Sequence, residues 1–536
     1  MLTAPSESKA DAHWRRAEVL TAGLITLWIV VLHVVYLFHA GPLWRDEADS
    51  VDFAGMPTMA EIWRNLHNDI SPPLFVAVAR VWALAGLNSD FDYRLLGFFI
   101  GIVTLGVFWW CARKLGDKSP LLALSLYAAN QLAIRVGDDL RPYGLGIALM
   151  LLATVMMWRF VHAPGRGTFL WAALTATLSV QCLYQNSMFI LAIACGAWMV
   201  TLPRREWKTA LQTGTIGLIA ALSLLPYWFI VTEGQISVGF RRQQVHFDEI
   251  WNLLDAAMEV SGKWMMPVWL GLITVGLVMA VIGRKGPRRR ELEYCGAVLV
   301  AGTAFYLLFL RVLGLPPHLW YFLILMAPAA LMLDAILGAP SFRWAQAGRM
   351  VLSLILIAAS VPVCYAGACL RQSNIDLIAA KLKADSQPGD LILVSPWYYG
   401  VSLHRHFDAS QWITLPPLDD VRIHRYDLVK KAMMTENPIG PLLDKIRAAL
   451  RSGHKLWVVG TIREPPNRDA PPVLPPYDGI MEQSEGRYFS NWEFQIGYLV
   501  ETHAVEGGRV EVPVPGNLAV NSVENIPLRV IRGWRD

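Results

Sequence analysis

Ionisable residues gather in the short polar segment that follows the first long apolar run of this 536-residue chain. Residues 41–55 read GPLWRDEADSVDFAG, in which Asp46 and Glu47 are adjacent and Asp49 and Asp52 follow. A carboxylate such as Asp46 can accept the proton of an attacking hydroxyl or amine, which is general-base catalysis. The structural alternative is that these acids begin a helix and stabilise its dipole.

Two further polar segments carry acids beside groups that bind phosphate or sugar. Asp69 precedes Ser71-Pro72-Pro73, and Asp138-Asp139-Leu140-Arg141-Pro142-Tyr143 separates two later apolar runs. Arg141 is informative because its guanidinium pairs either with a protein carboxylate or with a ligand phosphate. Three weaker candidates are each typical of a helix end or an aromatic belt when taken alone: Tyr184, His318 and Tyr321.

The apolar runs between these polar segments predict the helices that position the candidate residues. The sequence is 54% hydrophobic and 17% charged, with a mean hydropathy of +0.37. Each membrane-spanning helix needs about 20 apolar residues. We therefore predict an α-helical polytopic membrane protein with about eleven spans, at 19–39, 94–112, 119–136, 142–160, 168–186, 187–202, 209–231, 266–283, 294–313, 318–338 and 350–369.

Loop charge predicts the orientation, because Lys and Arg accumulate in short cytoplasmic loops. A cytoplasmic N-terminus then leaves the polar segments described above on the extracytoplasmic face, together with 40–71 and 232–265. The apolar stretch 72–88 contains Arg80 and would reverse this pattern if it crossed, so we predict a re-entrant or interfacial helix. The basic residues fall in alternate loops: Arg15 and Arg16; Arg113, Lys114 and Lys118; Arg159 and Arg166; Arg204, Arg205 and Lys208; Arg284, Lys285, Arg288, Arg289 and Arg290; Arg343 and Arg349.

Beyond residue 370 the composition is that of a soluble domain. We predict a membrane domain over 1–370 and an extracytoplasmic α/β domain over 371–536, with helices at 374–385 and 440–451 and strands at 391–396 and 456–460. Prolines mark 465–476 as a loop, and Gly507-Gly508 predicts a hairpin turn in a β-rich tail. His404-Arg405-His406 is interpreted as part of a surface strand rather than a metal site.

Composition excludes several classes of protein and site. A net charge of +4 from 47 basic and 43 acidic residues is too balanced for nucleic-acid binding through a basic surface. The six cysteines show no zinc spacing and no disulfide framework. Asp46 and Asp49 could share a divalent cation with a ligand phosphate if they lie on a helix. No metal or cofactor is firmly indicated, because Arg141 could supply the same compensating charge.

In their order, these motifs resemble those of the GT-C superfamily of integral-membrane glycosyltransferases. The resemblance covers about residues 15–370 and is to the branch of protein O-mannosyltransferases and lipid A aminoarabinose transferases. Asp46-Glu47 matches an Asp-Glu pair in the first outer loop, and Asp69 with Pro72-Pro73 matches an Asp-x-His-Pro-Pro-Leu element. Asp139, Arg141 and Tyr143 match an acid that lies two residues before Arg-x-Tyr.

The resemblance implies a hexosyl- or pentosyltransferase of the bacterial inner membrane with a polyprenyl-phosphate sugar as donor. The acceptor would be a glycolipid, a polysaccharide or a protein, as in the modification of lipopolysaccharide or cell-wall glycan. The resemblance also implies that Asp46 is the base and that Glu47 positions the acceptor or supports the site. The remaining candidates would bind the donor phosphate or the substrate: Asp69, Asp139, Arg141, Tyr143, Tyr184, His318 and Tyr321.

Two departures from the family pattern leave the donor sugar open. Ser71 replaces the usual His, and His318-Leu319-Trp320-Tyr321 occupies the place of an Arg-Tyr pair. The alternatives to an enzyme are a lipid transporter and a noncatalytic scaffold. A lipid transporter predicts charges in mid-span and an inverted repeat, and the sequence contains neither. A noncatalytic scaffold would leave the acidic cluster without a role.

Overall fold

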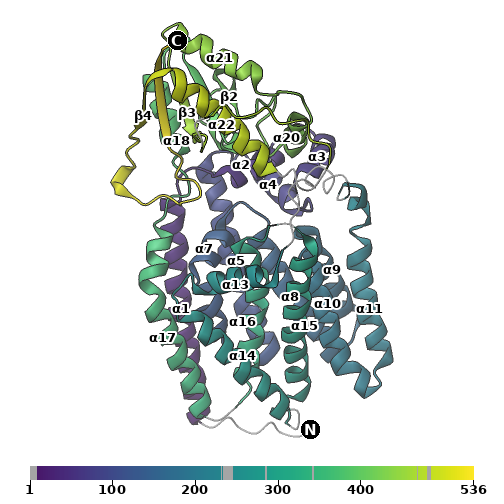
Figure 1. The fold of residues 1–536 in the computed structure, drawn as a ribbon. Helices are drawn as coiled ribbons and strands as arrows, with labels where there is room; N and C mark the ends of the chain where they lie inside the picture. Colours follow the sequence, from purple (N-terminus) through teal and green to yellow (C-terminus); the bar gives the residue numbers. More distant parts are fainter. Residues whose placement is uncertain are drawn as a thin grey trace.

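The computed structural model describes residues 9–69, 71–230, 232, 245–283, 286–314, 316–340, 343–466, 469–479 and 485–536. A long helical bundle carries an α/β domain at one end, and the short helices α2 to α4 lie between the two (Figure 1). Parts of several predictions lie outside the described residues: 1–8, Ile70, 231, 233–244 of the outer segment 232–265, Arg284 and Lys285, and 467–468 of the proline-rich loop.

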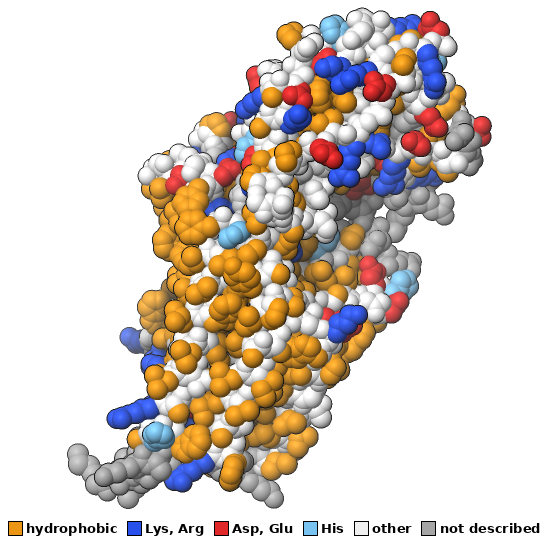
Figure 2. Space-filling view, turned by 90° about the vertical axis from the view of Figure 1, so that its left-hand side faces the viewer, with side chains coloured by type: hydrophobic (Ala, Val, Ile, Leu, Met, Phe, Trp, Pro, Cys, Tyr) orange, Lys and Arg blue, Asp and Glu red, His pale blue; other side chains and the backbone are white. Residues whose placement is uncertain are grey.

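Nine helical segments of the described chain are long and apolar enough to cross a membrane. Apolar side chains cover the flank of the bundle, whereas charged side chains gather on the C-terminal domain (Figure 2). The chain is a multi-pass membrane protein. The helices of these segments are α1 (Lys9–His39), α5 (Asp90–Gly116), α8 (Tyr143–His162), α10 (Asn186–Thr201), α11 (Trp207–Leu222), α14 (Met265–Ile282), α15 (Arg289–Leu313), α16 (Leu323–Leu337) and α17 (Arg343–Ala368).

The other two predicted spans are shorter than expected. Helix α9 (Arg166–Cys182) has 17 residues, or about 26 Å at the rise of an α-helix. The prediction of one helix over 119–136 is wrong, because this stretch consists of α6 (Leu121–Ala123), a π-helical turn (Leu124–Ala128) and α7 (Gln131–Asp138). The Asn130 side chain caps α7 by accepting the backbone N–H groups of Leu132 and Ala133.

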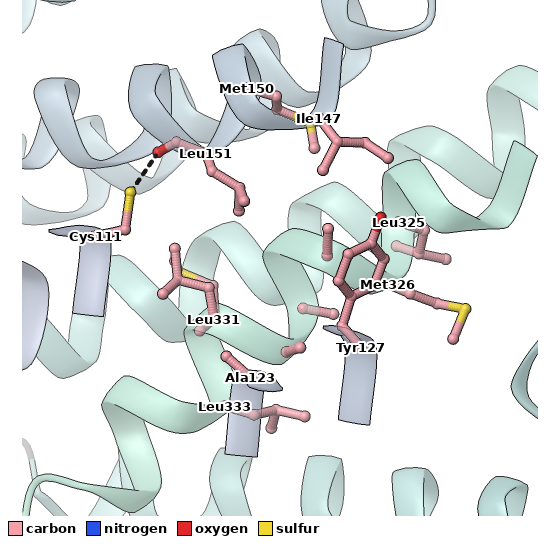
Figure 3. Close-up of a cluster of buried hydrophobic side chains, with 14 of the residues drawn as sticks. Cys111, Ala123, Tyr127, Ile147, Met150, Leu151, Leu325, Met326, Leu331 and Leu333 are labelled. Atoms are coloured by element: carbon pink, nitrogen blue, oxygen red, sulfur yellow. Dashed lines mark hydrogen bonds between the residues drawn. The ribbon is translucent and has the colours of Figure 1, made fainter. Parts of the chain in front are cut away.

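The centre of the bundle is formed by α16, of which every residue is buried. Tyr127 of the π-helical turn lies beside Leu325 and Met326 of α16, and Cys111 of α5 donates to the Leu151 carbonyl of α8 at 3.5 Å (Figure 3). The apolar residues of 121–129 therefore face protein rather than lipid, which explains why this segment does not need the length of a span.

Predicted cytoplasmic loops contact one another at the end of the bundle away from the α/β domain. Arg15 lies 3.5 Å from Asp117, and Arg204 donates to Glu293 at 2.8 Å. Arg349 pairs with Asp334 of α16 at 3.0 Å. Ion pairs between these loops show that the basic loops share one end, as the charge pattern predicts.

The stretch 72–88 contains a helix too short to cross a membrane. Helix α4 (Leu74–Leu84) has 11 residues, or about 17 Å. Arg80 donates to the carbonyl oxygens of Ala54 at 2.9 Å, Met56 at 2.6 Å and Pro57 at 3.1 Å. These bonds tie α4 to the chain that joins α2 (Arg45–Ala54) to α3 (Met59–Asn65). In the segment after α11 that the charge pattern predicts to be outside, α13 (Phe247–Glu259) contacts the 3₁₀ turn Leu319–Phe322.

The C-terminal domain contains a five-stranded sheet in the order β2-β1-β3-β5-β4. The predicted strands are confirmed as β1 (Leu391–Ser395) and β3 (Leu456–Gly460), a parallel pair, with β2 (Trp412–Thr414) parallel to β1. Strand β5 (Leu528–Trp534) is antiparallel to β3 and to β4 (Ala504–Val510). The helices are α18 (Ile375–Asp385), α19 (Gly400–Leu403), α20 (Tyr426–Met433), α21 (Gly440–Arg451) and α22 (Glu485–His503).

Three expectations for this domain are wrong. Gly507 and Gly508 lie inside β4, where they pair with Ile531 and Val530, so they form no hairpin turn. The tail is only partly β-structure, because α22 has 19 residues. His404, Arg405 and His406 follow α19 rather than lie in a strand, and all three face carboxylates of the membrane domain.

Candidate functional site

The predicted outer segments and the C-terminal domain border a small, partly open pocket. It lies where α2 begins, where α7 connects to α8, and beside two further segments, one that follows α17 and one between β4 and β5. Four residues predicted for the site line it: Asp46, Asp139, Arg141 and Tyr143. The other lining residues are Trp44, Arg135, Val136, Trp320, Gln372, Asn521 and Val523.

Asp46 lies in the first turn of α2 and faces the pocket. Its Oδ1 is 3.5 Å from Nε of Arg45 and 3.9 Å from Nε2 of His424. The side chain is 23% exposed, so a substrate hydroxyl can reach it. A carboxylate in this position can accept the proton of an acceptor hydroxyl.

Glu47 has the opposite environment, because its side chain is 0% exposed. It forms an ion pair with Arg94 of α5, and its Oε1 accepts the backbone N–H of Leu140 at 3.1 Å. Its Oε2 accepts the backbone N–H of Trp44 at 3.2 Å, which caps α2. Burial raises the pKa of Glu47 to about 8, although Arg94 opposes this shift. These contacts are those of a residue that supports the site from behind.

Arg141 joins the second predicted segment to the first. Its Nη1 donates to the Asp46 carbonyl at 3.2 Å and to Ser50 Oγ at 3.0 Å, and it lies 3.5 Å from Oδ2 of Asp49. Asp49 Oδ1 in turn accepts the backbone N–H of His424 at 2.7 Å. Burial pushes the pKa of Asp49 upward, but His424 and Arg141 outweigh it and hold the pKa below its ordinary value. Asp49 therefore faces Arg141 and His424 of the protein itself.

Asp139 and Tyr143 complete the wall of the pocket on the membrane side. Asp139 accepts the hydroxyl of Tyr36 at 2.7 Å, and burial raises the pKa of Asp139. Tyr143 accepts the indole N–H of Trp320 at 3.2 Å. Asp138 points elsewhere and lies 2.8 Å from Nδ1 of His33.

The other predicted residues surround the pocket without lining it. Asp69 accepts the backbone N–H of Ser71 and faces Arg141, and burial raises the pKa of Asp69 to about 6. Tyr184 packs against Tyr227 with ring centroids 6.5 Å apart. His318 stacks on Trp320 at 4.5 Å, while Tyr321 lies 6.3 Å from the Tyr143 ring. No group of three or more His, Cys, Asp or Glu residues that could hold a metal occurs in the described part of the chain.

No protein-family model and no curated protein matches this sequence. Among solved structures, ArnT from Cupriavidus metallidurans bound to undecaprenyl phosphate is similar, with a TM-score of 0.50 and 13% sequence identity. The match covers 82% of this chain and 93% of that chain. This chain has the GT-C fold. The resemblance inferred from the motifs is confirmed at the level of the fold.

Two other solved structures are similar to this GT-C fold. ArnT in the apo state matches with a TM-score of 0.50 and 13% identity, over 82% of this chain and 92% of that chain. The Archaeoglobus fulgidus oligosaccharyltransferase in complex with Zn and sulfate matches with a TM-score of 0.49 and 12% identity. That match covers 80% of this chain and 67% of the oligosaccharyltransferase chain.

Sequence reasoning missed several residues that the GT-C fold brings to this pocket. Arg135 of α7 could have been found, because it is a basic residue near the outer end of an apolar run, as Arg141 is. Its guanidinium has no ion pair within the described residues. Gln372, Asn521 and His424 carry no local signal, since they reach the site only through the docking of the C-terminal domain.

Proposed function

We propose that this protein is a glycosyltransferase that moves a sugar from a polyprenyl-phosphate donor to an extracytoplasmic acceptor in a bacterial inner membrane. The observation that carries the proposal is the shared pocket of Asp46, Arg135 and Arg141. A carboxylate can act as the base for the acceptor, and guanidiniums can stabilise the charge of a leaving lipid phosphate. The likeness of the fold to ArnT, whose structure contains undecaprenyl phosphate, supports a lipid-linked donor.

The proposed reaction is a direct displacement at the anomeric carbon. The acceptor hydroxyl gives its proton to Asp46, and its oxygen bonds to the anomeric carbon while the bond from that carbon to the phosphate oxygen breaks. Polyprenyl phosphate leaves with the bonding electron pair, next to Arg135 and Arg141, which stabilise its charge. A single displacement inverts the anomeric configuration.

The remaining candidates take supporting roles in the proposal. Glu47 fixes the start of α2 and thereby the direction of Asp46. Asp139 and Tyr143 contact the substrate from the membrane side of the pocket. Asp69, Tyr184, His318 and Tyr321 act through the residues that line it. The acceptor is a glycolipid, a polysaccharide or a protein, and the transferred group is a hexose or a pentose.

Release of polyprenyl phosphate by purified protein in nanodiscs tests the proposal. The assay uses a panel of undecaprenyl-phosphate hexoses and pentoses together with cell-envelope extract. Asp46→Asn keeps the shape of the side chain but removes the base, so we expect a loss of about 10²–10⁴-fold in kcat. Asp419→Asn, at an exposed aspartate of the C-terminal domain, serves as the matched control and should act like wild type.

Two outcomes contradict the proposal in different ways. If folded Asp46→Asn protein turns over donors as fast as wild type, another group is the base. If folded wild-type protein releases polyprenyl phosphate from no donor of the panel, the protein is not this enzyme.

A further inference from the structure

Two carboxamide side chains, Gln372 and Asn521, line the pocket together with Arg135 and Arg141. Gln372 follows α17 and is 1% exposed, whereas Asn521 precedes β5 and is 9% exposed. Asn521 Nδ2 donates to Gln372 Oε1 at 3.3 Å. The amide oxygen of Gln372 is therefore occupied by its neighbour, and its amino group remains for another partner.

The backbone holds both carboxamides in place. The N–H of Gln372 donates to the carbonyl of Ala40 at 2.7 Å, where α1 ends. Arg371 and Val520 form a parallel bridge, in which the N–H of Asn521 donates to the Arg371 carbonyl at 2.8 Å. Side chains fixed in this way need little reordering when a ligand binds.

The amino group of Gln372 is buried and has no hydrogen-bond partner within the described residues. A buried polar group without a partner lowers stability, and native proteins keep few of them. Because Gln372 lines the pocket, an oxygen atom of a bound ligand can accept this hydrogen bond.

The chemistry of the pocket indicates which kind of ligand oxygen, phosphate or sugar, accepts the hydrogen bond from Gln372. Arg135 and Arg141 provide the charge that a phosphate requires, whereas a neutral amide N–H suits a hydroxyl, ring or carbonyl oxygen of a sugar. A sugar ammonium group has only donors to offer, so a sugar that presents its ammonium group at this position cannot accept from Gln372. The two carboxylates of the pocket already face cations, Asp46 beside Arg45 and Asp139 at 4.0 Å from Arg94.

We propose that Gln372, oriented by Asn521, selects a neutral donor sugar that presents an oxygen acceptor and discriminates against sugars that carry a primary amine. The proposal rests on the proposed glycosyltransferase function and names the class of its donor sugar. Gln372 is the residue that contacts the sugar, and Asn521 is a positioning residue that acts through it.

The test compares kcat/KM for undecaprenyl-phosphate-linked neutral hexoses and pentoses with that for their amino-sugar analogues. Wild type should prefer the neutral donors. Gln372→Glu keeps the acceptor oxygen for Asn521 but replaces the amino group by a charged oxygen, so the ratio of neutral to amino donors should fall by about tenfold or more. Gln411→Met, at an exposed glutamine of the same domain, should leave the ratio unchanged.

A second variant separates the sugar from the phosphate as the partner of Gln372. Gln372→Met removes the donor without adding charge and should raise KM for neutral donors about tenfold. The inhibition constant of free undecaprenyl phosphate should be the same for this variant as for wild type, because Arg135 and Arg141 are intact. Asn521→Leu should act in the same direction with a smaller change in KM.

Three results would overturn the inference. An unchanged ratio in active Gln372→Glu protein would show that this residue does not read the sugar, and the proposed function would stand. Weaker inhibition of Gln372→Met by undecaprenyl phosphate would assign the amide to the phosphate instead. If folded wild-type protein turned over no donor of the panel, the proposed function and the inference would both be wrong.

Discussion

At the scale of single residues, the two adjacent acids at the start of α2 have opposite environments. Successive residues of a helix point about 100° apart. Asp46 therefore faces the pocket while Glu47 faces the bundle, where Arg94 and the backbone of Leu140 and Trp44 bind it. The sequence predicts that this pair is functional, but only the packing behind α2 separates the residue that touches substrate from the one that supports it.

Glu47→Gln should destabilise the protein by about 1–3 kcal/mol, because its amide has one acceptor oxygen in place of two and leaves a buried donor among Arg94, Leu140 and Trp44 without a partner. Unfolding in mixed micelles measures this difference. The double variant Glu47→Leu with Arg94→Leu should recover part of the stability, since no unpaired charge remains. Asp46→Asn, at a more exposed site, should unfold like wild type. Equal stability of Glu47→Gln and wild type would contradict the supporting role.

Asp69 should make stability depend on pH. Burial raises the pKa of Asp69 from its ordinary value near 3.8 to about 6. Between these two pH values the folded protein keeps a proton on Asp69 that the unfolded chain has released. The contribution of Asp69 to the free energy of unfolding thus falls as the pH rises from about 4 to above 6.

Asp69→Asn stays neutral and loses this dependence. The thermal midpoint of the variant should exceed that of wild type by a few degrees at pH 7, and the difference should vanish near pH 4. Asp419→Asn provides the exposed comparison at each pH. A difference that is constant across the range would mean that the carboxyl does not titrate in this window.

At the scale of elements, the apolar runs predict most helices well because a lipid-facing helix must be apolar over its whole length. The exception at 119–136 has a physical reason. The interior of a protein is as apolar as lipid, so composition does not show that 121–129 is enclosed by α16 and other helices. The cap formed by Asn130 is visible in the sequence, but an Asn within an apolar run is not by itself a helix start.

Helix α4 should not cross the membrane, and cysteine labelling tests this. Its 11 residues are too few for a span, so exposed positions on either side of it, Thr58 and Asn88, should lie on the same face. Thr58→Cys and Asn88→Cys, made without the six native cysteines, should both react with an impermeant maleimide from outside. Lys208→Cys, at an exposed position in the first turn of α11 next to a basic loop, should react only from the cytoplasm. Labelling of Thr58 and Asn88 from opposite sides would refute the predicted topology.

At the scale of the whole molecule, the pocket depends on contacts between residues far apart in the sequence. The hydrogen bond from His424 to Asp49 joins positions 375 residues apart, and no local pattern encodes such a contact. Four of the residues that line the pocket, Asp46, Asp139, Arg141 and Tyr143, belong to short motifs that the sequence shows. The contribution of the C-terminal domain was not predictable, since Gln372, Asn521 and His424 stand in segments whose own composition is unremarkable.

Arg405 should hold the C-terminal domain in the position that closes the pocket. Its guanidinium lies 2.8 Å from Asp52 of α2 and 2.7 Å from Asp90 of α5, and its side chain is 16% exposed. Arg405→Met leaves both carboxylates without their main counter-charge, so we expect faster hydrogen exchange in α2 and in 400–407, together with a lower kcat/KM.

Arg422→Met is the matched control, because Arg422 is 65% exposed and pairs with Asp420 of its own domain. The hydrogen exchange and the kcat/KM of this control should equal those of wild type. Exchange confined to α2 and 400–407 in Arg405→Met would show that the two domains separate while each stays folded. If that variant exchanged as slowly as wild type yet lost activity, Arg405 would act on the reaction directly and the closure of the pocket would not depend on it.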